Sequence, residues 1–203
     1  MARTLLIFTA VAVAQLHGAG LEHRTNQIRV RLYDYAGASP GTLSRAKAVA
    51  DQVFALAGVG LSWADCSADP NAPGDAACLL PVTTSDLQLR IISKEMAKRT
   101  PVSRHCLGYA VIGGEFSSIA SVFFHRALDL ESANFGDLSA ILGVMMAHEI
   151  GHLLLAERSH SRQGIMRAVW YEQDMKTMAK GWLWFTPAEA ALLNVNVQRR
   201  QRH

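Results

Sequence analysis

Apolar and polar residues alternate over residues 27–35, which predicts a strand with one buried face. The apolar side carries Ile28, Val30 and Leu32, and the other side carries Arg29, Arg31 and Tyr33. The spacing then becomes helical, because apolar residues recur at Leu43, Ala46, Ala50, Val53 and Ala57. Ser39-Pro40 supplies an N-cap residue and a first-turn proline, so we predict a helix over residues 40–57.

The remaining pattern predicts four more strands and two more helices. The strands fall at residues 61–63, 86–93, 109–112 and 119–124. A long helix starts near Asp137, a good N-cap residue, and its inward stripe is Leu138, Ile141, Met145, His148 and His152. A last helix starts at the capping box Thr186-Pro187-Ala188-Glu189 and passes through Leu192 and Val195. This order of elements predicts an α+β fold.

Composition narrows the class of protein. The chain has 203 residues, of which 50% are hydrophobic and 18% charged, so it suits one domain and excludes global disorder. The formal net charge is only +3. We interpret Arg199-Arg200-Gln201-Arg202 as a solvated tail, and we expect no nucleic-acid partner. We expect a monomer.

The N-terminus has the pattern of a secretory signal. Arg3 precedes an apolar run over residues 5–14, which is too short to cross a bilayer. Ala12-Val13-Ala14 predicts cleavage after Ala14, with Gly20 as a later alternative within a signal peptide of residues 1–20. A buried N-terminal strand is the other interpretation. A signal would make the protein secreted or periplasmic, with no stable membrane insertion after cleavage.

Export would permit disulfides, and the chain has three cysteines. Cys66 and Cys78 flank a loop of turn residues, so a bridge between them is the favoured pairing. Cys106 then stays unpaired in a monomer. His105-Cys106 could also be half of a metal site, but no C-x-x-C pair accompanies it, and we interpret Cys106 as a free or packed thiol.

The long helix carries the motif H-E-x-x-H at His148, Glu149 and His152. Side chains four residues apart lie one turn above each other, so both Nε2 atoms can reach one ion at about 2.0–2.1 Å. Glu149 is offset from His148 by about 100°, which places it beside the ion as a base for an activated water. Two alternatives are stacked core histidines and a closed structural zinc site.

A hydrolytic zinc site needs a third protein ligand and one open position. The downstream candidates are Glu157, His160, Glu172 and Asp174. Glu157 points away if the helix continues past Leu155, and Glu172 has no clear helical approach. His160 reaches the site only if the chain leaves the helix soon after Leu155 and turns back over residues 156–159.

The segment resembles the metzincin zinc peptidases, because a nearby third histidine and then Gly164-Ile165-Met166, similar to their Met-turn, follow H-E-x-x-H. The resemblance implies that His148, His152 and His160 hold one Zn²⁺, that Glu149 is the general base and that Met166 forms an apolar floor. It also implies a twisted mixed sheet with a backing helix and an active-site helix. Residues 21–203 then form one metallopeptidase domain, similar to small secreted bacterial types. Its upper lobe covers about 21–155, and a small lower lobe of about 156–203 ends in a helix.

Two positions depart from the family pattern H-E-x-x-H-x-x-G-x-x-H. Leu155 stands at the place of the glycine, and Arg158, which cannot ligate, stands at the place of the third histidine. No glycine lies between His152 and His160. We therefore expect the helix to end without the left-handed conformation that glycine adopts easily.

The resemblance implies a secreted endopeptidase whose substrate is an extended peptide or protein, paired with an exposed strand edge. Residues 106–112 or 113–118 are the candidate edge. Trp170, Tyr171, Trp182 and Trp184 could line a side-chain pocket or belong to the core, and Tyr171 could assist the transition state or only pack. The alternatives are a non-catalytic secreted zinc-binding module and a hydrolase of a non-peptide amide.

Overall fold

The computed structural model describes residues 26–66, 74–103, 105–113, 116, 118–158, 160–170, 173–174, 177 and 183–203. The predicted signal peptide lies outside these residues. The five strands are β1 (Gln27–Asp34), β2 (Gly60–Cys66), β3 (Asp86–Ile92), β4 (Gly108–Val111) and β5 (Ile119–Phe123). The helices are α1 (Pro40–Leu56), η1 (Ala76–Leu79), α2 (Lys94–Ala97), α3 (Phe124–Ser132), α4 (Leu138–Leu155) and α6 (Pro187–Arg200).

The strands form one mixed sheet in the order β2-β1-β3-β5-β4. Four strands run parallel, and β4 pairs antiparallel with β5 at one edge. The connection from β1 to β2 passes through α1, as parallel neighbours require. The predicted α+β class with a mixed sheet is confirmed.

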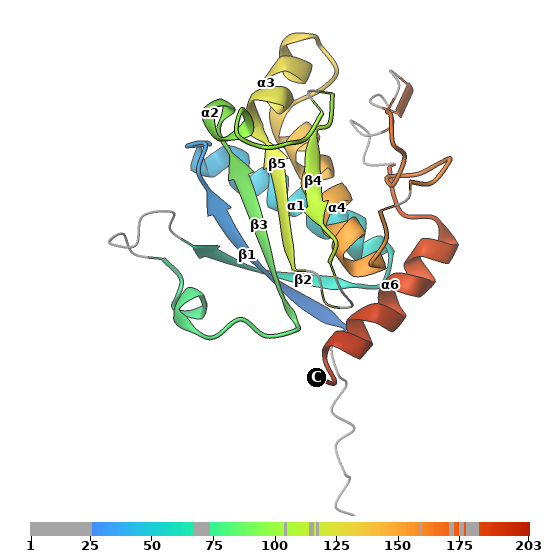
Figure 1. The fold of residues 1–203 in the computed structure, drawn as a ribbon. Coiled ribbons are helices and arrows are strands. Elements are labelled where there is room, and N and C mark those ends of the chain that lie inside the picture. The colour runs from blue at the N-terminus through green and yellow to red at the C-terminus, as the bar shows by residue number, and fades with distance from the viewer. Residues whose placement is uncertain are drawn as a thin grey trace, which may run out of the picture.

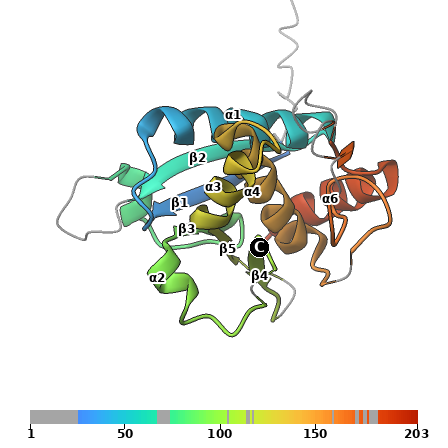
Figure 2. The ribbon, with the colours of Figure 1, turned by 90° about the horizontal axis from the view of Figure 1, so that it is seen from above.

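Helices α1 and α4 lie together on one face of the sheet (Figures 1 and 2). They cross closely at Gly143, where an added Cβ would lie 2.5 Å from the Ala46 carbonyl oxygen. The fully buried strand residues Ile28, Val30 and Leu89 join the same core. Helix α4 is apolar and long enough to cross a membrane by length and composition, but 89% of it is buried inside the fold. It is therefore a core helix here.

Helix α3 was not predicted, because the run Val122-Phe123-Phe124 continues the apolar pattern of the strand before it. The predicted strand at 61–63 was also too short, since β2 continues to Cys66. The other predicted elements occur within about two residues of their predicted bounds.

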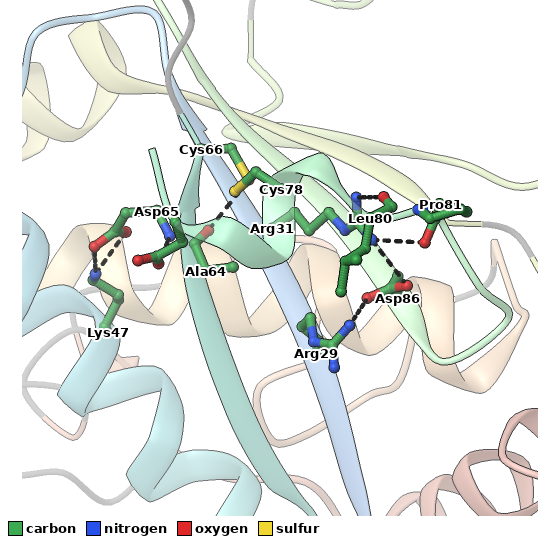
Figure 3. Close-up of a disulfide and its surroundings, with 11 residues drawn as sticks. Arg29, Arg31, Lys47, Ala64, Asp65, Cys66, Cys78, Leu80, Pro81 and Asp86 are labelled. Atoms are coloured by element: carbon green, nitrogen blue, oxygen red, sulfur yellow. Dashed lines mark hydrogen bonds and ion pairs between the residues drawn. A yellow bond between two sulfur atoms is a disulfide. The ribbon is translucent and has the colours of Figure 1, made fainter. Parts of the chain in front are cut away.

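The other face of the sheet buries an arginine that the alternating pattern assigned to a half-exposed side. Arg31 is 1% exposed and donates to the carbonyl oxygens of Leu80 and Pro81 at 2.8 and 2.9 Å and to Asp86 at 3.3 Å (Figure 3). Burial raises the pKa of Asp86, but hydrogen bonds from Thr83 and the charge of Arg31 outweigh it and hold that pKa below its ordinary value. The prediction that only the apolar face of this strand is buried was therefore wrong at Arg31, whose partners come from a distant loop and from the start of β3.

A disulfide joins Cys66, at the end of β2, to Cys78 in η1 (Figure 3). It ties the start of the loop that covers Arg31 to the edge of the sheet. Cys106 is a free thiol and is exposed.

The predicted solvated tail is wrong for Arg200, whereas Arg199 and Arg202 are exposed as expected. Arg199 and Arg200 belong to α6, and Arg200 is only 2% exposed. Its guanidinium donates to Thr84 O at 3.0 Å and to Leu153 O at 3.1 Å. Asn196 donates to Leu154 O at 2.8 Å, so α6 supplies donors to the terminal carbonyls of α4, which have no partner inside their own helix.

Candidate metal centre

Helix α4 positions the two histidines of the motif. Asp137 caps it by accepting hydrogen bonds from the backbone N–H groups of Ser139 and Ala140. His148, Glu149 and His152 lie in its last two turns and are 8%, 5% and 7% exposed. These residues are polar, yet they lie in a helix that is almost wholly buried. Such groups need specific partners to offset their burial.

Three imidazole rings converge at one point. The Nε2 atoms of His148 and His152 are 3.1 Å apart, and those of His152 and His160 are 3.3 Å apart. Two ligands at about 2.0–2.1 Å from a tetrahedral zinc are separated by about 3.4 Å. The cluster therefore fits a single Zn²⁺, with all the facing ligand atoms within 4.8 Å of one another.

Backbone carbonyls fix the tautomers of the two helical histidines. Nδ1 of His148 lies 2.8 Å from Ile165 O, and Nδ1 of His152 lies 2.8 Å from Glu157 O. A carbonyl only accepts, so each Nδ1 carries the proton and each neutral ring leaves a lone pair on Nε2. Two lone pairs facing each other repel unless a cation lies between them. This is the usual outer arrangement of a histidine metal ligand.

The pKa values support neutral rings. Burial lowers the pKa of His148 to about 3, against the opposite effect of its bond to Ile165. Burial also lowers the pKa of His152, and it lowers the pKa of the more exposed His160. All three imidazoles are therefore available as ligands at neutral pH.

Glu149 lies beside the cluster and is not one of the converging groups. Burial raises its pKa to about 8, and its Oε2 has no hydrogen-bond partner among the described residues. A Cβ on Gly108 would lie 2.6 Å from its Oε1, so the glycine at the start of β4 makes room for the carboxyl group. The result is a buried acid that lines the same cavity as the three histidines, with one oxygen that accepts no hydrogen bond from the described residues.

Ala156 makes the turn at the end of α4, in which the chain has no glycine. It ends α4 in the left-handed conformation, with φ 55° and ψ 31°, so the expectation that the helix would end without that conformation was wrong. The N–H groups of Ala156 and Glu157 both point to His152 O. The bond from His152 Nδ1 to Glu157 O holds the reversed chain against the helix.

Ala156→Gly is expected to raise the free energy of unfolding by about 0.5–1 kcal/mol. A side chain in the left-handed region costs about 1–2 kcal/mol, and the larger entropy that glycine loses on folding offsets part of the gain from removing it. The midpoint temperature of thermal unfolding should rise by a few degrees. Ala133→Gly is the matched control, since Ala133 also ends a helix but has φ −86°. Ala133→Gly should destabilise the protein. An increase in the free energy of unfolding equal to that of Ala156→Gly would contradict the strain at Ala156.

The loop that carries His160 is fastened to α6. Ser161 donates its backbone N–H to Met166 O at 2.8 Å, and its hydroxyl donates to Glu189 Oε1. Glu189 is the third residue of α6, and its other oxygen accepts from Thr186 N at 2.7 Å to form the predicted capping box. One carboxylate thus caps a helix and holds the residue next to His160.

Ser161→Ala is expected to weaken zinc binding by up to about tenfold, the low end of the range for groups bonded directly to metal ligands, because its hydroxyl acts on His160 only through the neighbouring backbone. Little change in stability is expected. Thr186→Ala removes the cap but leaves the bond between Ser161 and Glu189, so it should cost about 1 kcal/mol of stability without changing zinc affinity. Competition with a chelator and denaturant unfolding measure the two quantities. Equal zinc affinity in Ser161→Ala and wild type would refute the positioning role.

Met166 is buried against Gly151 of α4, the residue before His152. It is 1% exposed, and a Cβ on Gly151 would lie 2.7 Å from its Sδ. Its neighbour Ile165 accepts from both His148 Nδ1 and Trp170 Nε1, the latter at 3.2 Å. Met166 therefore approaches the turn of α4 between the two histidines, where a larger residue than glycine would not fit.

The centre opens into a cavity of about 540 Å³. One wall comes from β4, the edge strand, through Tyr109 and Ala110, and another comes from residues 167–170. Trp170 lines the cavity, while Trp184 is 46% exposed and does not.

Of the other candidates for third ligand, Glu157 offers its carbonyl to His152. Asp174 is bound to Arg167 at 2.9 Å. Glu172, Tyr171 and Trp182 lie outside the described residues. Sequence reasoning missed Gly108 and the bond between Ser161 and Glu189, because no local pattern reports which distant residues touch.

Fold and site together define an α+β protein with a cluster of three histidines, two buried and one exposed, that lines a cavity. Comparison of the sequence with protein-family models gives no match, and comparison with curated proteins gives none. The structure is similar to archaemetzincin from Methanopyrus kandleri, with 18% identity and a TM-score of 0.54 over 88% of this chain and 100% of that one. It is also similar to a zinc-dependent peptidase from Methanocorpusculum labreanum, with 17% identity and a TM-score of 0.51 over 81% and 99%. At these identities the likeness shows a shared fold.

Proposed function

We propose that this protein is a zinc-dependent endopeptidase. His148, His152 and His160 hold one Zn²⁺, and Glu149 is the general base. The observation that carries the proposal is the meeting of three Nε2 atoms beside a buried carboxyl group at the floor of a cavity. One of the similar solved structures is named archaemetzincin and the other a zinc-dependent peptidase, which supports the same class here.

A zinc ion in this place supplies Lewis-acid chemistry that polarises a carbonyl group and makes water more acidic. Glu149 moves the protons. Its pKa of about 8 in the metal-free protein falls when positive charge is held next to it, so that its carboxylate is available near neutral pH. It accepts a proton from the attacking water and returns it to the leaving amine. Gly108 keeps this carboxyl group in its position.

Strand β4 is the proposed peptide-binding edge. Its partner β5 occupies one side, and the sheet ends at β4, so the other side can pair with an extended peptide. Residues 164–166 are the proposed equivalent of the metzincin Met-turn, with Met166 against Gly151 as its apolar floor. We further propose a mature, monomeric protein outside the cytoplasm, supported by the signal-like N-terminus and the disulfide between Cys66 and Cys78.

A mixed peptide library tests this function. Zinc-loaded protein should generate new peptide termini, detected by mass spectrometry, and a chelator should abolish them. One zinc per protein molecule without cleavage would replace the proposal with a non-catalytic binding module. Hydrolysis confined to non-peptide amides would place the protein in another class of hydrolase.

A further inference from the structure

Arg158 bridges the loop of the third histidine and the edge strand. It lies two residues before His160 and follows directly on the left-handed turn of Ala156 and Glu157. Its Nη2 donates to Ile112 O, one residue beyond the end of β4. Arg158 and Ile112 both line the cavity, so this contact closes one end of the proposed peptide site.

The charge of Arg158 is not balanced within the cavity. Glu149 is the only carboxylate among the described residues that line it, and it belongs to the metal centre. The second lining arginine, Arg167, has the carboxylate of Asp174 at 2.9 Å from its Nη1. No ion pair between described residues includes Arg158. Among the described residues, Arg158 is therefore the one cation of the cavity wall without a carboxylate partner, and it lies at the end where β4 stops.

A guanidinium has five donors in a planar fork that matches a carboxylate. Arg158 uses one of its nitrogens on Ile112 O and is exposed, so the rest of the fork can reach a ligand. The neighbouring walls are mainly apolar, with Ile112 and Leu107 among them, and a less polar surrounding strengthens a charge-assisted bond.

We propose that Arg158 determines specificity and selects a peptide with a carboxylate on the side of the scissile bond that faces the end of β4. The carboxylate belongs to an aspartate or glutamate side chain, and the free C-terminus of a peptide offers the same chemistry. This inference rests on the proposed peptidase function and names its substrate class.

Binding tests the inference independently of cleavage. The probe is a labelled neutral peptide series in which a single aspartate moves along the sequence, each member paired with its asparagine counterpart. Dissociation constants are measured by fluorescence anisotropy on zinc-loaded full-length protein carrying Glu149→Gln, which slows turnover. At one position the aspartate peptide should bind about tenfold more tightly than its asparagine partner, as a charge-assisted hydrogen bond provides.

Variants at Arg158 distinguish the effect of its charge from the effect of its hydrogen bond to Ile112 O. Arg158→Gln keeps an N–H donor for Ile112 O and should remove the preference while zinc affinity, measured by chelator competition, stays unchanged. Arg162→Gln is the matched control, because Arg162 is exposed in the same loop and does not line the cavity. It should keep the preference. Arg158→Glu should reverse it in favour of lysine peptides.

The outcomes distinguish this inference from the proposed function. Equal binding of aspartate and asparagine peptides at every position, or equal loss in Arg162→Gln, would overturn it even if wild-type protein cleaves peptides. A preference that depends on Arg158 supports it even if wild-type protein cleaves nothing. Comparison of free and amidated C-termini identifies the source of the carboxylate, since a preference confined to free C-termini assigns Arg158 to the end of the peptide.

Discussion

Glu149→Gln is expected to lower kcat/KM for peptide hydrolysis by about 10²- to 10⁴-fold, the range that a positioned general base contributes. Glutamine preserves the shape of a side chain that lies against Gly108 with no spare room, but it cannot accept the proton. Zinc should stay bound at one ion per protein molecule, because Glu149 is not among the converging ligands. Activity equal to wild type would remove Glu149 from the mechanism.

The same variant has an independent signature in the metal-free protein. The folded state holds a proton on Glu149 up to about pH 8, whereas the unfolded protein releases it near the ordinary value of 4.5. Stability therefore falls as the pH rises between these values, and Glu149→Gln abolishes this contribution. The free energy of unfolding of the variant should increase relative to wild type across this window. A constant difference would show an ordinary, solvated carboxyl group.

His160→Ala is expected to lower zinc affinity by more than the roughly 10- to 100-fold that loss of an outer partner causes, because it removes one of three protein ligands. His160 is the best choice among the three since it lies on an exposed loop, and its loss leaves the core of α4 intact. Chelator competition measures the affinity, and thermal unfolding of the metal-free protein checks the fold.

His105→Ala is the matched control for His160→Ala. His105 is also an exposed histidine that lines the cavity, but it is not part of the cluster. It should bind zinc like wild type. If His160→Ala also binds zinc like wild type while Glu172→Ala does not, the third ligand is a carboxylate.

The helix that carries His148 and His152 could be predicted because its evidence is local. The apolar stripe from Leu138 continues into His148 and His152, and a spacing of four residues places both rings on one face of any helix. The structure brings these Nε2 atoms to 3.1 Å from each other. The capping box at Thr186 and Glu189 could also be predicted from the sequence, because both partners lie within one turn.

The path of the loop to His160 could not be predicted in the same way. Its left-handed residue is an alanine, which carries no sequence signal, and distant contacts support the loop beyond it. Ser161 is held by Glu189, 28 residues later in the sequence. Resemblance to a family favoured His160 as the third ligand, which stays a prediction, whereas the residues alone left four candidates open.

The two errors about arginine have the same physical origin. The alternating pattern placed Arg31 on the side of its strand opposite the apolar face, and Arg200 was assigned to a solvated tail, since charged residues are rarely fully buried. Both are buried because backbone carbonyls 47 to 116 residues away accept their hydrogen bonds. Hydrogen bonds between residues so far apart in the sequence are visible only in the folded protein.

Zinc titration of the metal-free protein, with peptide hydrolysis followed at each addition, tests the central claim most directly. We predict that hydrolysis is absent without metal, rises linearly with added zinc and stops rising at one equivalent per protein molecule. Zinc binding at one equivalent with no hydrolysis, or hydrolysis that is unchanged by removal of zinc, would contradict the claim that the three histidines hold a catalytic ion.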